Sequence, residues 1–338
     1  MSAAGTNVYL LYLEWPERCF RAGTSDLAYF RTLVPAGSKV VRVRNDRAFL
    51  RALPTATHAV VWHFRREWFD RAPRLRVLAT PAAGREFVPS DAPPGVTVHF
   101  GGFHGGVIAE SVLAFLLAWS RGFFAVERQA RGGADLRGES PRWPRTWLSS
   151  RCSTLAGAKA VVIGFGRIGR TIAAKLEAQG AQITGVTRHG VFASSASRRA
   201  SRPAPKTVRD LPELRTADVL VLALPGDTGT DNLLDARVLA KLPRWCVVVN
   251  IGRGNSVDER SLIAALRRGR LAAAYLDVCK AEPTALMNVA GGRPAEAAVL
   301  SADAAELPWN LFVMPHASAF SADYLRRCFK ELKDAGLV

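Results

Sequence analysis

The chain reads Ala160-Val-Val-Ile-Gly-Phe-Gly-Arg-Ile-Gly169 near its middle. The apolar run is typical of a buried strand, and Gly164, Gly166 and Gly169 follow it in the spacing G-x-G-x-x-G, before a helical pattern. In this context the glycines allow a tight turn, close approach of a pyrophosphate to the backbone, and close packing of helix on strand. The stretch predicts an α/β domain with a pyrophosphate at a helix N-terminus, and a glycine turn without a ligand is the alternative.

The alternation of apolar runs and helical patterns extends to both sides of this stretch. Downstream, further strands are predicted at Gln182–Val186, Val219–Leu224, Val247–Asn250, Ala273–Leu276 and Leu311–Val313. Upstream, strands are predicted at Val8–Leu13, Val40–Val43, Ala59–Trp62, Val77–Thr80 and Val96–His99, with short helices at Asp26–Leu33, Asp46–Leu53 and Arg66–Arg71. Because strands that alternate with helices form parallel sheets, we expect an α/β protein with two doubly wound parallel sheets.

The two series are joined by a glycine-rich loop and an apolar helix. The loop is Gly101–Gly106, the helix runs from about Val107 to Arg121, and an irregular connection follows from Arg131 to Arg151, with Trp143 and Trp147 as anchors. The domains are expected at residues 1–105 and 106–318, with a C-terminal segment at 319–338.

The composition favours small ligands over a polymeric partner. The chain has 338 residues, 49% of them hydrophobic, and its 46 Lys and Arg against 29 Asp and Glu give a net charge of +17. These basic residues are spread along the whole sequence, so we expect no nucleic-acid partner.

No apolar run is long enough to span a membrane. The N-terminus has no basic segment before Val8 and is not expected to be a signal peptide. Five scattered cysteines without a Cys-x-x-Cys pair indicate reduced thiols, no metal site and a cytoplasmic protein.

The choice between dinucleotides depends on the residues after Val186. An Asp or Glu there would bind the ribose 2′-hydroxyl, but the chain continues Thr187-Arg188-His189. Arg188 is suited to stack on adenine and to pair with a 2′-phosphate. Arg198 and Arg199 follow in the same basic segment and are more simply explained as solvated side chains. We therefore expect NADP(H) to be preferred and NAD(H) to be possible.

Three polar residues follow later strands of the same series. Arg253 lies between two glycines after Val247–Asn250, Glu282 follows the strand that ends at Leu276, and His316 follows Leu311–Val313. Parallel strands deliver such residues to one sheet edge, where α/β proteins bind ligands. Taken singly, each has a plain alternative: a surface charge, a turn residue or a core histidine.

Together these elements resemble the D-isomer-specific 2-hydroxyacid dehydrogenase family. The resemblance runs from about Val77 to Tyr324, and the narrower likeness is to its NADP-using, glyoxylate/hydroxypyruvate reductase-like branch. The matching elements are Gly101–Arg121 with Ala109-Glu110, the Gly164 motif, Ala217-Asp218 through Leu224-Pro225, Asn250–Glu259, Leu276–Pro283 and Pro315-His316. The family has a flavodoxin-like substrate domain and a Rossmann dinucleotide-binding domain, with the active site in a cleft between them.

The resemblance implies a role for each site residue in reducing a 2-keto acid to its D-2-hydroxy acid. Arg253 would hold the carboxylate, His316 would donate the proton, and Glu282 would orient the imidazole. Backbone N–H groups of Ala83 and Gly84 would complete the carboxylate site. The cofactor-binding residues that the resemblance implies are Gly164, Gly166, Arg167, Ile168, Gly169, Thr187, Arg188, Leu224, Pro225, Ile251 and Asp277. The family also implies a homodimer and a C-terminal return to the first domain, here one helix from Ala322 to Asp334.

Departures from the family pattern leave alternatives open. The segment Asn288–Ala305 is read as a surface insertion, and His104 is either a substrate-side residue or, by preference, a loop histidine without function. A dinucleotide-sensing, corepressor-like binding protein shares this fold, and formate or phosphite oxidation is a third reading. The extended tails of the corepressors are not evident here.

Overall fold

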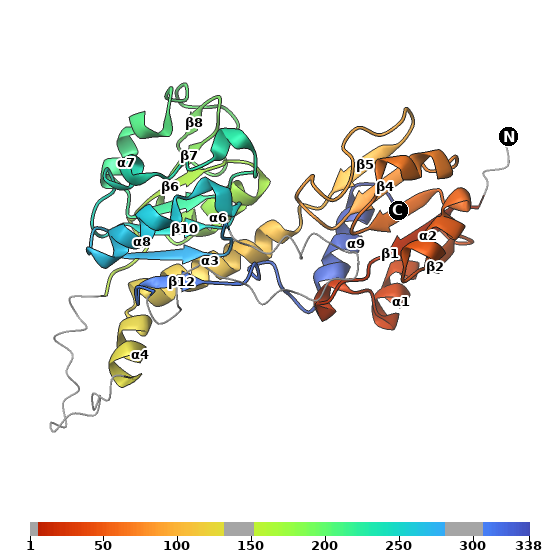
Figure 1. Cartoon of the computed structure of the whole chain (residues 1–338), viewed down its shortest axis with the longest axis horizontal. Coiled ribbons are helices and arrows are strands. Elements are labelled where there is room, and N and C mark those ends of the chain that lie inside the picture. The colour runs from red at the N-terminus through yellow and green to blue at the C-terminus, as the bar shows by residue number, and fades with distance from the viewer. Residues whose placement is uncertain (1–5, 132–151, 281–306) are drawn as a thin grey trace. The chain divides into compact units, whose positions relative to one another are not determined.

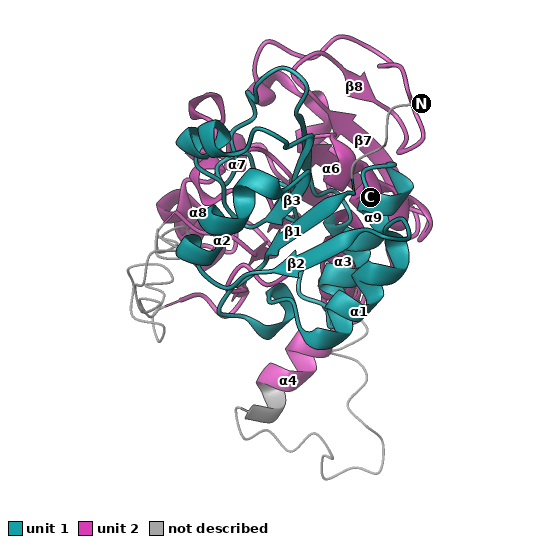
Figure 2. Cartoon of the chain, turned by 90° about the vertical axis from the view of Figure 1, so that its right-hand side faces the viewer, with its two compact units in different colours: residues 1–104, 319–338 teal, residues 105–318 magenta. Residues whose placement is uncertain are grey.

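The structure is a computed structural model that describes residues 6–131, 152–280 and 307–338. The chain forms two compact units, unit 1 (Met1–His104 with Ala319–Val338) and unit 2 (Gly105–Ser318), which Figure 2 shows in separate colours. Several predictions concern residues outside the described ranges. They are those for most of the 131–151 connection, including Trp143 and Trp147, for Glu282 and for the 288–305 segment.

Unit 1 contains a five-stranded parallel sheet in the order β2-β1-β3-β4-β5. Its strands are β1 (Val8–Tyr12), β2 (Lys39–Arg42), β3 (His58–Val61), β4 (Val77–Thr80) and β5 (Thr97–Phe100). This is the flavodoxin-like order. All four residues of β3 are buried, as expected for a central parallel strand that is covered on both faces. The predicted parallel sheet is confirmed, and each predicted strand lies within one residue of the observed bounds.

The helices of unit 1 come from both ends of the chain (Figure 1). They are α1 (Thr24–Leu33), α2 (Asp46–Ala52) and α9 (Tyr324–Asp334), with 3-10 turns at Arg18–Phe20, Leu53–Thr55 and Arg66–Arg71. The α-helix predicted at Arg66–Arg71 is therefore a 3-10 turn. Helix α9 packs against α1, where the rings of Phe329 and Phe30 are 4.7 Å apart. The C-terminal helix thus belongs to unit 1.

His104 is a core residue of unit 1. It is the first residue of α3 (His104–Ser120) and is only 4% exposed. Its Nε2 lies 2.7 Å from the hydroxyl of Tyr324, and its ring stacks on Phe103 at 4.1 Å. The loop position expected from the sequence is wrong, because this histidine lies within a helix and packs against α9.

Unit 2 contains a seven-stranded sheet in the order β12-β11-β10-β9-β6-β7-β8. The strands are β6 (Lys159–Ile163), β7 (Gln182–Val186), β8 (Val191–Phe192), β9 (Val219–Leu222), β10 (Val247–Asn250), β11 (Ala273–Leu276) and β12 (Leu311–Val313). All pairings are parallel except that of β7 with β8, which is antiparallel. This order is that of a Rossmann sheet with an antiparallel edge strand, which the sequence did not predict.

Helices cover the sheet of unit 2. They are α3, α4 (Phe123–Arg131), α6 (Arg167–Glu177), α7 (Ala236–Leu239) and α8 (Glu259–Arg267), with 3-10 turns at Val208–Asp210, Pro212–Thr216, Thr228–Thr230 and Gly254–Ser256. Helix α6 buries Ile172, Ala173 and Leu176, while Phe115 of α3 stacks on Tyr275 of β11 at 4.9 Å. The doubly wound fold predicted for this half is confirmed.

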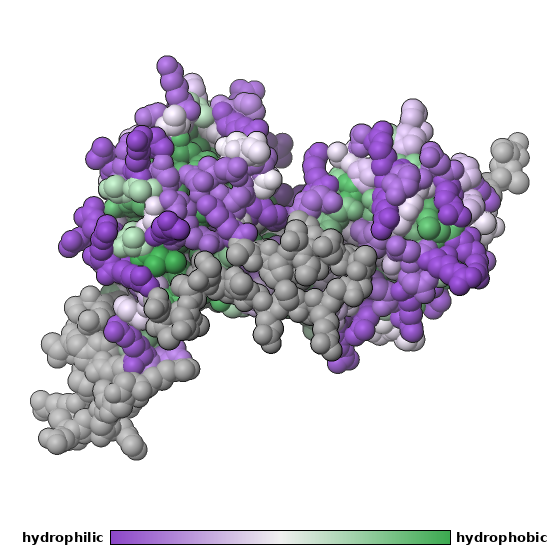
Figure 3. Space-filling view, viewed as in Figure 1, coloured by the Kyte–Doolittle hydropathy of each residue, from purple (hydrophilic) through white to green (hydrophobic). Residues whose placement is uncertain are grey.

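The exterior of both units is mainly hydrophilic on the face that Figure 3 shows. Among the described residues, no helix has the length and apolar character needed to cross a membrane, and no group of three potential metal ligands occurs. Large exposed apolar side chains include Phe123, which is 65% exposed, and Trp245, which is 63% exposed.

Candidate functional site: the carboxyl edge of the unit 2 sheet

The carboxyl ends of the unit 2 strands carry most of the predicted site residues. The glycine motif follows β6, Leu224 and Pro225 follow β9, Ile251 and Arg253 follow β10, Asp277 follows β11, and His316 follows β12. Because these strands are parallel, the loops lie at one edge of the sheet. The chain changes direction across the sheet between β6 and β9, and α/β proteins bind ligands at such a switch point.

The glycine loop after β6 is shaped by close backbone contacts. Gly164 has φ +94°, and a Cβ there would lie 2.3 Å from the carbonyl oxygen of Ala223. A Cβ on Gly169 would lie 2.1 Å from the carbonyl oxygen of Gly164. Only glycine fits these two positions, because both contacts are with backbone oxygens, and at Gly164 the positive φ also disfavours a side chain.

Gly166 differs from Gly164 and Gly169, because it has open space around it. A Cβ there would meet no atom within 4 Å, so a side chain would project into open space beside the helix. Gly166 is also the N-cap of α6 and provides no side-chain cap. The first N–H groups of α6 are therefore available to an anion, and the helix dipole favours negative charge there. This arrangement fits the pyrophosphate of a dinucleotide.

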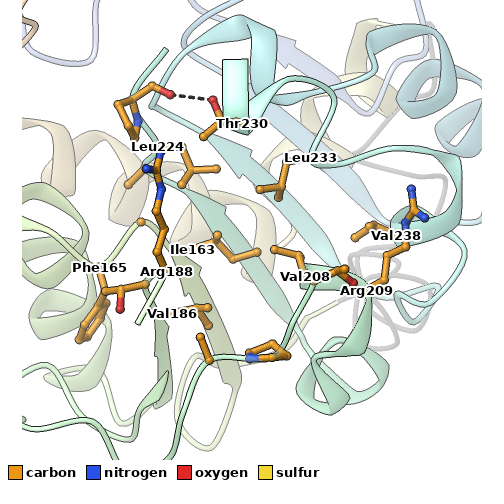
Figure 4. A pocket seen from close by; sticks show the side chains of 18 of the residues that line it. Ile163, Phe165, Val186, Arg188, Val208, Arg209, Leu224, Thr230, Leu233 and Val238 are labelled. Atoms are coloured by element: carbon orange, nitrogen blue, oxygen red, sulfur yellow. Dashed lines mark hydrogen bonds between the residues drawn. The ribbon is translucent and has the colours of Figure 1, made fainter. Parts of the chain in front are cut away.

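A cavity of about 750 Å³ opens between the loops after β6, β7 and β9 (Figure 4). Its aliphatic lining is formed by Ile163, Val186, Val208, Leu224, Leu233 and Val238. Gly164 and Gly166 lie on one side, and Arg188, Lys206 and Arg209 add positive charge. A largely apolar pocket of this size with a few charged groups suits a nucleoside flanked by phosphates.

Arg188 lines the cavity, and its guanidinium has a carboxylate partner. Its Nη2 lies 2.6 Å from Oδ2 of Asp227, in the loop after β9. Arg198 and Arg199 are exposed and do not line the cavity. The sequence reasoning missed Asp227, although it follows β9 at the same sheet edge.

The sequence did not predict two other basic residues that line the cavity. Lys206 precedes the 3-10 turn Val208–Asp210 and Arg209 lies within it, and no periodic pattern in the sequence marks either residue. Arg209 also forms an ion pair with Asp235. Lys206 has no such ion pair within the described part of the chain.

Arg170 fixes the basic segment that follows β7. Its guanidinium donates to the carbonyl oxygens of Ser195 and Ser197 at 3.1 and 2.7 Å. It also lies over the rings of Phe165 and Phe192, at 4.5 and 4.8 Å from their centroids. Part of the positive charge near this segment therefore serves to fold it.

Arg253 lies between two glycines that permit tight packing of its loop. A Cβ on Gly252 would lie 2.5 Å from the backbone nitrogen of Leu224, and one on Gly254 would lie 2.0 Å from the carbonyl carbon of Cys279. The buried side chain of Asn250 accepts from the Gly252 N–H at 3.2 Å and donates to the carbonyl of Arg253 at 3.1 Å. The backbone that presents the Arg253 guanidinium is therefore fixed by its neighbours.

Asp277 holds the loop that carries His316. Its Oδ1 accepts from the backbone N–H groups of Ala317 and Ser318, at 3.0 and 2.9 Å. The carboxyl is 3% exposed, and burial raises its pKa, while the charge of His316 opposes that shift. His316 itself has φ +53°, a rare conformation for a non-glycine residue. Such local strain is often found at functional positions.

The remaining predicted residues are not joined to this group by the described structure. Ala83 and Gly84 follow β4 in unit 1, at the carboxyl end of its own sheet. A Cβ on Gly84 would lie 2.3 Å from Oε1 of Glu86, the end of a flexible side chain that can move aside. Glu282 lies outside the described residues.

Comparisons with known proteins agree with this architecture. Residues 113–307 match the family described as D-isomer specific 2-hydroxyacid dehydrogenase, NAD binding domain. The chain is 32% identical over 217 residues to D-3-phosphoglycerate dehydrogenase of Mycobacterium leprae, a match covering 63% of this chain and 38% of the relative. It is 29% identical to glyoxylate reductase of Thermococcus kodakarensis, with 64% of each protein covered. The chain thus spans less than two thirds of both relatives.

Solved structures share the fold across nearly the whole chain. A D-lactate dehydrogenase from Treponema pallidum superposes with a TM-score of 0.70 at 20% identity, covering 97% of this chain and 95% of that one. A D-isomer specific 2-hydroxyacid dehydrogenase from Xanthobacter autotrophicus, in complex with NADPH and MES, gives 0.66 at 24% identity, covering 98% and 96%. On the match to its dinucleotide-binding half, the chain belongs to the D-isomer specific 2-hydroxyacid dehydrogenase family.

Proposed function

We propose that this protein is an NADPH-preferring reductase that converts a small 2-keto acid into the D-2-hydroxy acid, and catalyses the reverse oxidation. The observation that carries the proposal is the meeting of the glycine loop, Arg253 and His316 at the carboxyl edge of one parallel sheet. An anion-binding helix terminus, an arginine and a histidine at that edge are the groups that this reaction requires. Relatives act on several substrates, as the names glyoxylate reductase and glycerate dehydrogenase indicate.

Each residue has a defined chemical role in this proposal. Arg253 binds the substrate carboxylate and polarises the carbonyl oxygen through its planar set of donors. His316 donates a proton to that oxygen in reduction and accepts it in oxidation. Glu282 orients the imidazole, and the N–H groups of Ala83 and Gly84 bind the carboxylate. The bound nicotinamide supplies or accepts the hydride.

The two units divide this work. Unit 2 binds the dinucleotide, which is consistent with the family match over residues 113–307. Unit 1, with α9, contributes the substrate-binding turn after β4.

We further propose a homodimer in which α3 takes part. Light scattering is expected to give twice the chain mass, and a monomer at all concentrations would contradict that state.

A panel of 2-keto acids tests the activity. The protein is mixed with NADPH or NADH and with glyoxylate, hydroxypyruvate, pyruvate, phenylpyruvate or a branched 2-keto acid, and nicotinamide absorbance is followed. Oxidation of NADPH with at least one acid is expected. Dinucleotide binding without turnover of any acid would instead favour the corepressor-like binding protein.

The preference for NADPH is attributed to Arg188. From Thr187 to Arg209 the chain has no carboxylate to accept hydrogen bonds from a ribose 2′-hydroxyl, and Lys206 adds a second positive charge at the cavity. The Xanthobacter autotrophicus relative was crystallised with NADPH.

Reversing the charge at position 188 is expected to reverse part of this preference. Arg188→Asp removes a charge-assisted donor and places a carboxylate beside the 2′-phosphate, so the ratio of kcat/KM for NADPH to that for NADH should fall about thirtyfold. Steady-state kinetics with both dinucleotides measure the ratio. Arg198→Asp is the matched control, because Arg198 is exposed in the same segment but does not line the cavity. An unchanged ratio in Arg188→Asp would contradict the assignment.

A further inference from the structure

The ion pair between Arg188 and Asp227 joins two sides of the dinucleotide cavity. Arg188 follows β7 and Asp227 follows β9, and these strands lie on opposite sides of β6. The pair is close, with 2.6 Å between Nη2 and Oδ2. In Figure 4 the Arg188 side chain extends from the end of β7 towards the segment that carries Leu224 and Thr230. The guanidinium is therefore already engaged by a carboxylate at the place where the cofactor's adenosine would bind.

The loop of Asp227 is well fixed. Its carbonyl oxygen accepts from Thr230 N at 2.9 Å, from Thr230 Oγ1 at 2.7 Å and from Asn255 Nδ2 at 3.2 Å. Thr230 is 4% exposed. A Cβ on Gly229 would lie 3.1 Å from Oδ1 of Asp227, so glycine leaves room for this carboxylate. Asp227 is thus held next to Arg188 by its own loop.

One oxygen of this carboxylate is not satisfied. Oδ1 of Asp227 is buried and has no hydrogen-bond partner among the described residues. A buried acceptor without a partner is a cost to the folded protein. The ion pair itself is open to solvent, since the Arg188 and Asp227 side chains are 70% and 42% exposed, and such a pair adds little stability. The carboxylate is therefore poorly explained by stability alone.

We propose that Asp227 is a specificity-determining residue that weakens the binding of 2′-phosphorylated dinucleotides by competing for Arg188. This inference rests on the proposed function. A 2′-phosphate and the Asp227 carboxylate require the same guanidinium, and two anions on one cation repel each other. A dinucleotide without the 2′-phosphate does not enter this competition. Asp227 thus narrows the difference in affinity between NADPH and NADH that Arg188 and Lys206 create.

The test compares two carboxylates of one loop. Asp227→Asn removes the competing charge with little change of shape. Asp231→Asn makes the same change at a residue that lines the cavity, accepts from Asn255 at 2.6 Å and, in the described part of the chain, has no ion pair with Arg188. Each full-length variant is titrated by calorimetry with adenosine 2′,5′-bisphosphate and with AMP, and then with NADPH and NADH.

We expect Asp227→Asn to tighten binding of adenosine 2′,5′-bisphosphate and NADPH about fivefold, the size expected for an exposed ion pair. The Kd values for AMP and NADH should stay unchanged, and Asp231→Asn, which removes a charge at the cavity but no ion pair with Arg188, should tighten binding of the bisphosphate and NADPH less than Asp227→Asn does. An equal gain in both variants would show a general effect of net charge and overturn the inference. A purely structural role for Asp227 would alter AMP and bisphosphate binding alike.

A second measurement tests whether Asp227 acts through Arg188. In an Arg188→Ala background, Asp227→Asn should no longer tighten bisphosphate binding, because the contested donor is gone. A gain that persists would overturn the competition. If the unmodified protein binds neither dinucleotide, the proposed function fails and this inference with it. Binding of both with no selective response to Asp227→Asn defeats this inference alone.

Discussion

Replacing His316 by glutamine is expected to lower kcat for 2-keto acid reduction about a thousandfold, the scale of a lost general acid. The Kd for NADPH should change little, because the cavity and the glycine loop are formed by other strand ends. Stopped-flow measurements of nicotinamide absorbance, with enzyme, NADPH and the best 2-keto acid of the panel, give kcat. Fluorescence titration gives the Kd for NADPH.

The backbone conformation at position 316 makes a second variant useful. His316 has φ +53°, and Asn adopts this conformation more readily than other non-glycine residues. His316→Asn therefore removes the imidazole with less backbone strain than His316→Gln. His189→Gln is the matched control, because His189 is exposed in the same unit and does not line the cavity. Full turnover in either His316 variant would refute its role as the proton donor.

The pH dependence adds a directional check. Reduction requires the protonated imidazole, so kcat/KM for reduction should fall as pH rises through the pKa of His316. Oxidation requires the neutral imidazole and should fall as pH decreases. The buried Asp277 carboxylate interacts electrostatically with His316, and this interaction opposes the rise in the Asp277 pKa that burial causes. Both of these pH dependences should disappear in His316→Asn. A pH dependence that persists in that variant belongs to another group.

Much of the fold was predictable because burial on both faces makes parallel strands apolar throughout. Strands β7, β10 and β11 were predicted with the observed bounds. The edge strand β8 was missed, since it has two residues and depends on the turn in which the Thr187 N–H donates to the Gly190 carbonyl. So short a strand leaves no periodic pattern in the sequence.

The site was predictable only where it follows strand ends. Arg253 and His316 were proposed in this way, because parallel strands place their carboxyl ends together, and their roles stay predictions. Asp227 was not, since its pairing with Arg188, 39 residues earlier, depends on how two loops fold toward each other. Contacts between loops are set by local packing, such as the fixation of Asp227 by Thr230, and no short motif encodes them.

Replacing Arg253 by alanine is expected to lower kcat/KM for the 2-keto acid about a thousandfold. The loss combines a charge-assisted contact to the carboxylate with polarisation of the carbonyl. Steady-state kinetics with NADPH at saturation measure it. Arg260→Ala is the matched control, because Arg260 is exposed on α8 and outside the proposed site.

The loss of activity in Arg253→Ala is not expected to come from a loss of stability. The backbone of Arg253 is fixed by Asn250, whose side chain bonds to both Gly252 and Arg253, and by the tight contacts of Gly252 and Gly254. The midpoint of urea unfolding should therefore stay close to that of the unmodified chain. Arg253→Lys keeps the charge but not the planar pair of donors, so it should recover only part of the activity. Full activity in Arg253→Ala, or equal activity in Arg253→Lys and the unmodified chain, would show that the carboxylate is held by another group.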